Sequence, residues 1–284
     1  YFDLATSTEV DRTFLVERHL ISKDLAAGEG PRGVALNDSE VVSIMINEED
    51  HLRIQVIKSG MQVRPTWNRI NRLDDGLEKT LDFAFSPQFG YLTSCPTNVG
   101  TGMRVSVMMH LPALVITKEI ERVFYAVAKI NLAVRGLYGE GTQASSDFFQ
   151  ISNQISLGRS EEQVLQTIES VIPNIIDYER KARDALLRDN RGKLEDRIYR
   201  AYGVLKSARM ISTDELMEKL SALRLGVNLE LIRDLNIKTV NEFFILTQPA
   251  HLQKHEKRVL DAPERDSVRA DFIRKRLGGS NGKE

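Results

Sequence analysis

The sequence predicts an α+β fold, in which a large, mainly antiparallel β-sheet flanked by helices is followed by an all-helical C-terminal domain. Several short β-branched runs follow one another without a helix between them, which favours antiparallel pairing. Beyond residue 158, apolar residues recur three or four apart to the end of the chain, which is typical of amphipathic helices. We therefore predict a first domain at 1–182 and a helical domain at 183–284.

The first domain alternates between the two kinds of pattern. Runs rich in Val, Ile, Phe and Tyr predict strands, whereas apolar residues spaced like Trp67, Ile70 and Leu73 predict a helix. We expect strands at 12–18, 41–46, 52–57, 91–94, 103–109, 132–135 and 148–152, and helices at about 65–84 and 118–129.

The helical part carries its own start signals. Ser160 with Gln163 forms a plausible capping box at the start of a long helix. Residues 212–215, Ser-Thr-Asp-Glu, form a second start signal, and glycines separate other segments.

Composition excludes several classes of protein. The 284 residues have a formal net charge of −1, with 42% hydrophobic and 28% charged residues, so we expect no nucleic-acid partner. No apolar run approaches the roughly 18 residues of a membrane span, so no membrane partner is expected. The single cysteine, Cys95, excludes an internal disulfide and fits a reducing cytoplasm. The chain begins at Tyr1 within an apolar run, so we expect it to be a fragment of a longer protein.

The chain is organised around an acidic segment at 47–53, Asn-Glu-Glu-Asp-His-Leu-Arg, between two predicted strands. Three consecutive carboxylates repel one another, so their crowding suggests a cationic partner. A solvated turn is the alternative. Carboxylates bind a guanidinium group through two hydrogen bonds, which makes an arginine-like ligand a good candidate.

Two glycine-containing loops carry further candidates. Residues 95–104 combine Cys95 and Arg104 with two glycines, whose backbone amides suit an anion. A cysteine beside arginines is expected to have thiolate character, whereas a buried, inert cysteine is the alternative. Residues 135–141 place Arg135 and Glu140 in a glycine-bracketed loop, where specificity residues often lie. With Arg53, these arginines suit the phosphates of a nucleotide, and the carboxylates suit a guanidinium.

Several of these segments resemble the phosphagen (guanidino) kinase family. The resemblance rests first on 47–53 and on 95–102, Cys-Pro-Thr-Asn-Val-Gly-Thr-Gly. The segments at 91–95, 106–112 and 135–141 resemble the bacterial protein-arginine kinase branch of that family, as does Arg265-Asp266-x-x-Arg269-Ala270 in the helical part. The resemblance extends over essentially the whole chain and implies the catalytic fold of guanidino kinases.

The resemblance also implies roles for individual residues. Glu49 is expected to act as the base, Glu140 to hold the substrate guanidinium with it, and Cys95 to contact the guanidinium from the side. The residues implied to bind ATP are His19, Arg53, Arg104, Val105, Ser106, Val107, Met108, Arg135, Gly136, Leu137, Tyr138, Gly139 and Glu140. Arg265, Asp266 and Arg269 are implied to bind phosphoarginine as an allosteric signal.

The family implies ATP as the phosphoryl donor and Mg²⁺ carried by the nucleotide, with no metal site built from the protein. It implies protein substrates with exposed arginines, a homodimer, an activator protein, a Clp ATPase, and roles in stress response and protein quality control. One feature departs from the family: a Ser-Ser-Arg-x-Arg segment expected N-terminal to Tyr1 does not occur in this sequence. Without these arginines, a non-catalytic phosphoarginine-binding adaptor stays open as an alternative. A kinase of free arginine also stays open, because the sequence gives no steric proof that the substrate is a protein.

Overall fold

The computed structural model describes residues 1–136 and 145–278, which form two compact units. The first unit comprises Tyr1–Val107, Tyr125–Val134 and Ile151–Asn174. The second comprises Met108–Phe124, Arg135–Gln150 and Ile175–Glu284. The units interleave along the chain, so the domain boundary expected at 182 stays a prediction.

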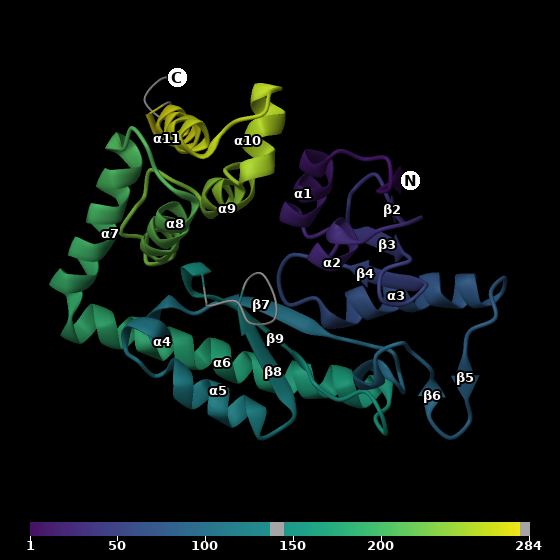
Figure 1. Cartoon of the computed structure of the whole chain (residues 1–284). Helices are drawn as coiled ribbons and strands as arrows, with labels where there is room; N and C mark the ends of the chain where they lie inside the picture. Colours follow the sequence, from purple (N-terminus) through teal and green to yellow (C-terminus); the bar gives the residue numbers. More distant parts are fainter. Residues whose placement is uncertain (137–144, 279–284) are drawn as a thin grey trace. The chain divides into compact units, whose positions relative to one another are not determined.

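A four-stranded antiparallel sheet lies in the first unit, in the order β1-β2-β3-β4 (Figure 1). Its strands are β1 (Phe2–Asp3), β2 (Gly33–Leu36), β3 (Val42–Ile46) and β4 (Leu52–Val56). Ile46 pairs with Leu52, so β3 and β4 form a hairpin around the acidic segment. The strands expected on both sides of that segment are confirmed.

The strand expected at 12–18 is wrong, because residues 12–17 lie in the helix α1 (Glu9–Glu17) and Arg18 caps its C-terminus. Thr8 caps this helix: its hydroxyl accepts from the Asp11 amide at 3.2 Å, and the Asp11 carboxylate accepts from the Thr8 amide at 3.3 Å. This capping box outweighs the weak strand preference of the run Thr-Phe-Leu-Val. A short helix, α2 (Lys23–Ala27), follows.

The two helices pack on the sheet through one apolar cluster. Burial of each large aliphatic side chain contributes about 1.5–3 kcal/mol, which is enough to hold short elements in place. The cluster consists of Leu4, Leu15, Leu20, Ile21, Leu25, Val34 and Met45.

The next helix, α3 (Val63–Glu78), confirms the predicted amphipathic segment but ends before residue 84. The amide and the hydroxyl of Thr80 both donate to the Leu77 carbonyl, at 2.9 and 3.1 Å, and this local bonding ends the helix. A small hairpin, β5 (Phe85–Ser86) and β6 (Gly90–Tyr91), follows. Of the strand expected at 91–94, only the first residue, Tyr91, lies in a strand.

A three-stranded sheet has the order β7-β9-β8, with strands β7 (Ser106–His110), β8 (Leu132–Gly136) and β9 (Phe148–Asn153). The helices α4 (Pro112–Ile116) and α5 (Ile120–Ala128) lie between β7 and β8 in sequence. The boundary between the units passes through these strands. The α+β class is confirmed, and the described strands are distributed over three sheets.

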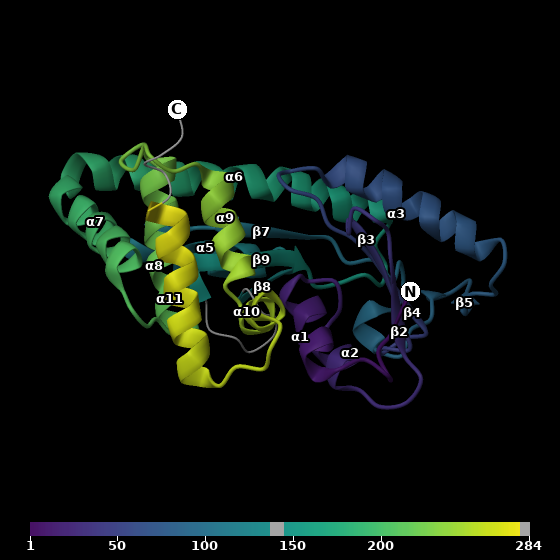
Figure 2. The ribbon, with the colours of Figure 1, turned by 90° about the horizontal axis from the view of Figure 1, so that it is seen from above.

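The long helix α6 (Glu161–Asp189) begins at the predicted capping box. The Ser160 amide donates to the Gln163 side chain at 3.0 Å, and the Gln163 amide donates to the Ser160 hydroxyl at 3.2 Å. Arg64 of α3 bonds Glu162 and Glu169 of α6 at 2.9 Å each, and Figure 2 shows α3 beside this end of α6.

Five helices complete the second unit: α7 (Arg191–Ser207), α8 (Thr213–Asn228), α9 (Ile237–Leu246), α10 (Pro249–Glu256) and α11 (Ala262–Gly278). α8 packs against α7 and α9, and α11 packs against α7 and α10. Gly226 allows the first of these contacts, because a Cβ atom there would overlap the Ile198 side chain. Of the helices that the structure describes, none is long and apolar enough to cross a membrane.

Candidate active site

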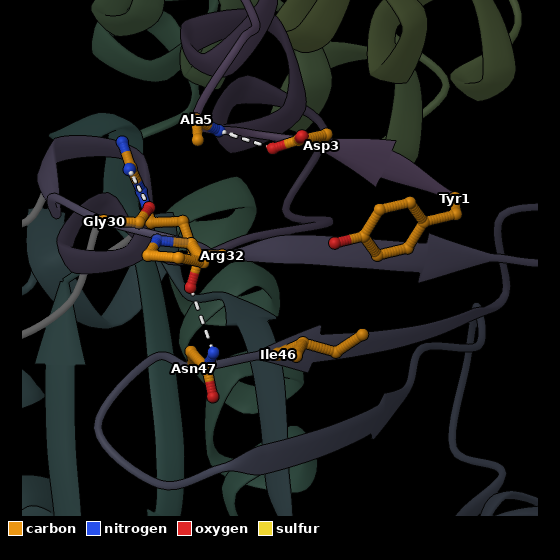
Figure 3. Close-up of a pocket in the computed structure, with 8 residues that line it drawn as sticks. Tyr1, Asp3, Ala5, Gly30, Arg32, Ile46 and Asn47 are labelled. Atoms are coloured by element: carbon orange, nitrogen blue, oxygen red, sulfur yellow. Dashed lines mark hydrogen bonds between the residues drawn. The ribbon is translucent and has the colours of Figure 1, made fainter.

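The acidic segment forms the turn between β3 and β4. Asn47 has a φ of 56°, a left-handed conformation that asparagine tolerates better than most residues. Its amide donates to the His51 carbonyl at 3.0 Å and closes the turn. Its side chain donates to the Pro31 carbonyl at 3.0 Å, which fixes the base of the turn to the segment before β2 (Figure 3). The three carboxylates at 48–50 therefore lie at the tip of an anchored hairpin.

Each of the three carboxylates has a different environment. The Glu48 side chain is only 5% exposed, and its carboxylate accepts from Arg53 Nη1 at 2.8 Å. The Asp50 carboxylate accepts from the Ser94 amide at 2.7 Å. Glu49 is exposed, and within residues 1–136 and 145–278 its carboxylate has no hydrogen-bond or ion-pair partner. Two carboxylates thus hold the turn, and the one between them remains available to a ligand.

The loop after Ser94 holds Cys95 beside this turn. Cys95 is half-buried, and its Sγ atom lies 2.9 Å from the Thr97 hydroxyl. The Ser156 hydroxyl lies 3.0 Å from both the Thr97 and Val99 carbonyls, which ties the loop to the segment before α6. Gly100 has a φ of +113°, and a Cβ atom there would lie 2.8 Å from the Ser156 carbonyl oxygen. Only glycine fits this position.

The Asp50 anchor leads to a prediction about Cys95. Replacing Asp50 by Ala removes one hydrogen bond of about 1 kcal/mol, which corresponds to roughly fivefold in an equilibrium between closed and open loop states. We expect Cys95 to react about fivefold faster with iodoacetamide in this variant. The chain has a single cysteine, so the rate reports this site alone. Asp50→Asn keeps a side-chain acceptor for the Ser94 amide and serves as the control; equal rates in all three proteins would contradict the anchor.

The predicted nucleotide-binding arginines occupy defined positions. Arg53 lies on β4 with half of its side chain exposed. The exposed Arg104 donates from Nη2 to the buried Ser152 hydroxyl at 2.9 Å. Asn153 accepts from the Val105 amide at 2.8 Å and donates to the Met103 carbonyl at 3.1 Å. The start of β7 is therefore fixed to the end of β9.

The remaining predicted site residues are divided between the units. His19 follows α1 in the first unit, where its carbonyl accepts from Gln55 of β4 at 2.6 Å, and loss of water around the ring lowers the pKa of its imidazole. Val105, Ser106 and Val107 belong to the first unit, whereas Met108, Arg135 and Gly136 belong to the second. Leu137, Tyr138, Gly139 and Glu140 lie outside the described residues. The structure thus brings together Glu49, Arg53 and the Cys95 loop.

The predicted phosphoarginine motif lies on α11 in the second unit. Arg269 is 1% exposed and donates to the Thr247 carbonyl at 3.0 Å, to the Ile211 carbonyl at 2.8 Å and to Asp266 at 2.6 Å. Arg265 is half-buried and donates to the Leu260 carbonyl at 2.8 Å. In this conformation Arg269 joins three segments of the helical region, while Arg265 and Asp266 keep exposed surface.

A second polar cluster, which sequence reasoning missed, lies around His110 at the end of β7. His110 is 8% exposed, with Nε2 at 2.9 Å from the Ser221 hydroxyl and Nδ1 at 2.9 Å from Arg224 Nη1. Ser221 in turn donates to Asp147 at 2.5 Å. Burial, Arg224 and Arg183 together hold the pKa of His110 well below 6.5. Each hydrogen bond of this cluster joins residues at least 74 positions apart in sequence, so no local motif could have predicted it.

The low pKa of His110 predicts a loss of stability in acid. The unfolded imidazole takes up a proton near pH 6.5, whereas the folded one does not, so its contribution is complete above pH 6.5 and is lost as the pH falls. The groups facing His110 are Arg224 of α8, Arg183 of α6 and, through Ser221, Asp147. Between pH 7.5 and 5.5 the unfolding free energy of the wild type should fall more than that of His110→Gln, by at most about 1.4 kcal/mol. Chemical denaturation at both pH values checks this, and equal losses would contradict it.

Metal ligands do not gather in the described part of the chain, where no group of three His, Cys, Asp or Glu side chains is placed to hold an ion.

Comparison with known proteins assigns the chain to a family. Residues 1–182 match the ATP:guanido phosphotransferase C-terminal catalytic domain, and residues 191–284 match the protein-arginine kinase McsB C-terminal domain. A protein-arginine kinase of Symbiobacterium thermophilum is 50% identical over 97% of this chain and 78% of that protein. The Bacillus subtilis protein-arginine kinase is 49% identical over 94% of this chain and 74% of that protein.

Solved structures agree with these matches. A duplicated taurocyamine kinase from Schistosoma mansoni, with bound transition-state-analogue components, superimposes with a TM-score of 0.57 at 31% identity, covering 62% of this chain and 26% of that one. A lombricine kinase superimposes with a TM-score of 0.54 at 28% identity, covering 62% of this chain and 52% of that one. The hairpin that presents Glu49, the adjoining cysteine loop and these likenesses agree, and the chain belongs to the ATP:guanido phosphotransferase family, in its protein-arginine kinase branch.

Proposed function

We propose that the protein transfers the γ-phosphoryl group of ATP to a guanidino nitrogen of arginine residues in protein substrates. The observation that carries this proposal is the environment of Glu49, an exposed carboxylate between two carboxylates that are already bonded. Relatives about 50% identical over most of the chain are named protein-arginine kinases, which supports protein-bound arginine as the acceptor.

A guanidinium group has a pKa above about 12, so at neutral pH it is a poor nucleophile. A base must take a proton from the attacking nitrogen as the bond to phosphorus forms. Glu49 is the proposed base, because an unpaired carboxylate binds a guanidinium through two hydrogen bonds and also accepts its proton. Glu48 and Asp50 keep the turn in place, so Glu49 needs little reorganisation on binding.

Two further residues are proposed to position the acceptor. Glu140 would bind the opposite edge of the guanidinium, so that one nitrogen faces the γ-phosphorus. Cys95 would contact the group from the side. Its loop is bonded to the acidic turn through Ser94 and Asp50, which supports a shared site with Glu49.

The phosphates would be held by Arg53, Arg104 and Arg135. Arg53 uses Nη1 for Glu48, and its remaining N–H donors can bind phosphate oxygens. Phosphoryl transfer depends mainly on positioning and charge neutralisation, which arginines and Mg²⁺ supply together. We propose that Mg²⁺ arrives on the nucleotide, because phosphate oxygens are ligands that it prefers. His19, Val105–Met108 and Gly136–Gly139 would complete the nucleotide site.

The same proposal includes phosphoarginine as an allosteric signal. Arg265 and Asp266 keep exposed surface on α11 and would contact a phosphoarginine, and a rearrangement would be needed for Arg269 to join them. We also propose a homodimer, an activator protein and a Clp ATPase as partners, and a cytoplasmic role in protein quality control and stress response, on family likeness alone.

A phosphotransfer assay on the full-length protein tests the proposal. The assay contains ATP, Mg²⁺ and an arginine-rich protein, with free arginine as the competing acceptor. We expect an acid-labile product on the protein, because the phosphorus–nitrogen bond of phosphoarginine breaks in acid, whereas phosphoserine persists. Equal turnover of free arginine would indicate a small-molecule kinase. No transfer, with phosphoarginine still bound, would indicate an adaptor.

A further inference from the structure

Four side chains of the second unit form one continuous hydrogen-bonded chain. It runs from Arg224 to His110 at 2.9 Å, from His110 to Ser221 at 2.9 Å and from Ser221 to Asp147 at 2.5 Å. Arg224 and Ser221 lie on α8, His110 ends β7, and Asp147 immediately precedes β9. We call these four residues the α8 network.

The hydrogen bonds of the α8 network all run in one direction, with the donor on the Arg224 side and the acceptor on the Asp147 side. Ser221 has one hydroxyl proton, and it donates that proton to Asp147, whose carboxylate accepts. The Ser221 oxygen therefore accepts from His110 Nε2, so this nitrogen carries the imidazole proton. His110 Nδ1 is then the acceptor for Arg224. One neutral tautomer of His110 satisfies every bond, which makes the network directional and leaves it no alternative arrangement of protons.

Asp147 sits in a strained backbone. Asp147 and Ser146 have φ values of 57° and 62°, a left-handed conformation that costs about 1–2 kcal/mol for most residues, such as Ser146, and that aspartate tolerates better. Two contacts hold the turn in this conformation: Ser221 bonds the Asp147 side chain, and the Leu111 amide donates to the Asp147 carbonyl at 2.9 Å. The turn at 146–147, which leads into β9, is thus held in part by its bond to α8.

The centre of the α8 network is buried: Ser221 and His110 are 1% and 8% exposed, whereas Arg224 and Asp147 keep part of their surface exposed. The Phe148 ring lies 4.7 Å from the His110 ring and 5.3 Å from the Arg224 guanidinium, and it contacts Phe244 of α9 at 5.1 Å. The residues after His110 are also held, because the buried Glu179 of α6 accepts from the amides of Ala113 and Leu114 at 3.1 and 3.0 Å. A buried hydrogen bond in such surroundings is stronger than an exposed one, so its loss should disturb the end of the strand that it anchors.

We propose that the α8 network is a positioning device for phosphoryl transfer, which fixes the end of β7 and the start of β9 in the arrangement that nucleotide binding requires. It rests on the proposed function, because Ser106, Val107 and Met108 of the same strand belong to the proposed nucleotide site. The network also joins the two matched family regions: His110 and Asp147 lie within 1–182, and Ser221 and Arg224 lie within 191–284. The C-terminal helices thereby help to fix the end of the strand that carries Met108.

The deciding variant is Ser221→Ala in the full-length protein, because it removes the central hydroxyl with little change in volume. We expect the KM for ATP to rise about five- to tenfold, while the KM for the protein substrate changes less than twofold. A hydroxyl with a purely structural role would lower the melting temperature and leave the ratio of the two KM values unchanged. The matched control is Ser43→Ala, since both serines are 1% exposed and the Ser43 hydroxyl has no hydrogen-bond partner in the described part of the chain. Both KM values of the control should stay within twofold of wild type.

A second variant covers the case in which Ser221→Ala fails to fold. His110→Gln places an amide donor near the position of Nε2 but loses the acceptor for Arg224, so it should raise the KM for ATP in the same way. Unchanged KM values for ATP in a folded variant, with active wild type, would overturn the network and leave the proposed function standing. If the wild type transfers no phosphate, the proposed function fails. The dissociation constant for Mg·ATP is then measured in wild type and in Ser221→Ala. Equal constants would overturn the proposed role of the α8 network.

Discussion

Replacing Glu49 by Gln is expected to lower kcat for arginine phosphorylation at least 100-fold without unfolding the protein. Glutamine keeps the shape of the side chain but cannot take a proton from the guanidinium, and general base catalysis typically contributes 10²–10⁴-fold. A 100-fold loss corresponds to about 2.7 kcal/mol of transition-state stabilisation. The Glu49 carboxylate is exposed and unpaired among the described residues, so its loss should leave the unfolding free energy nearly unchanged.

Steady-state kinetics with ATP and an arginine-rich protein measures this effect. Asp38→Asn is the matched control, because it removes one exposed carboxylate from the other turn of the same sheet, between β2 and β3. The control should keep wild-type turnover. A Glu49→Gln enzyme that retains more than a tenth of wild-type kcat would remove Glu49 from the role of base.

Replacing Arg269 by Met is expected to destabilise the helical region by about 2–6 kcal/mol, because two carbonyl acceptors lose their donor, at about 1–3 kcal/mol each. Methionine fills much of the same volume but leaves the Thr247 and Ile211 carbonyls without the donors that Arg269 supplies. It also leaves the Asp266 carboxylate without its partner at 2.6 Å. Unsatisfied buried acceptors account for most of the cost, because Asp266 itself keeps 31% of its side chain exposed.

Urea denaturation followed by the helical circular dichroism signal measures the change. Arg276→Met on the same helix is the control, since Arg276 is half exposed and makes only weak surface contacts, an ion pair with Glu242 at 3.0 Å and a contact with the Phe272 ring at 5.9 Å among the described residues. It should cost less than about 1 kcal/mol. An Arg269→Met protein as stable as this control would show that Arg269 is free to serve as a ligand rather than as a structural tie.

The elements with a strong local pattern could be predicted from the sequence. The strands on both sides of the acidic turn and the capping box at Ser160 have patterns that depend on neighbours only a few residues away. The segment 12–18 shows the limit, because its β-branched residues favour a strand, whereas Thr8 and Asp11 cap a helix. The capping signal was present in the sequence, and its weight depended on the apolar cluster beneath α1.

The candidate site shows the same division. The sequence by itself determined the expected chemistry, because three carboxylates, a single cysteine and several arginines predict a guanidinium-and-phosphate site whatever their exact distances. Only the tertiary structure decided which carboxylate is available, since Glu48 and Asp50 take partners that the strand register and the cysteine loop bring to them. The tertiary structure also buries Arg269 and brings His110 within hydrogen-bond distance of Ser221, 111 positions away in sequence. Burial and long-range pairing arise from packing between distant segments, and a linear pattern does not contain them.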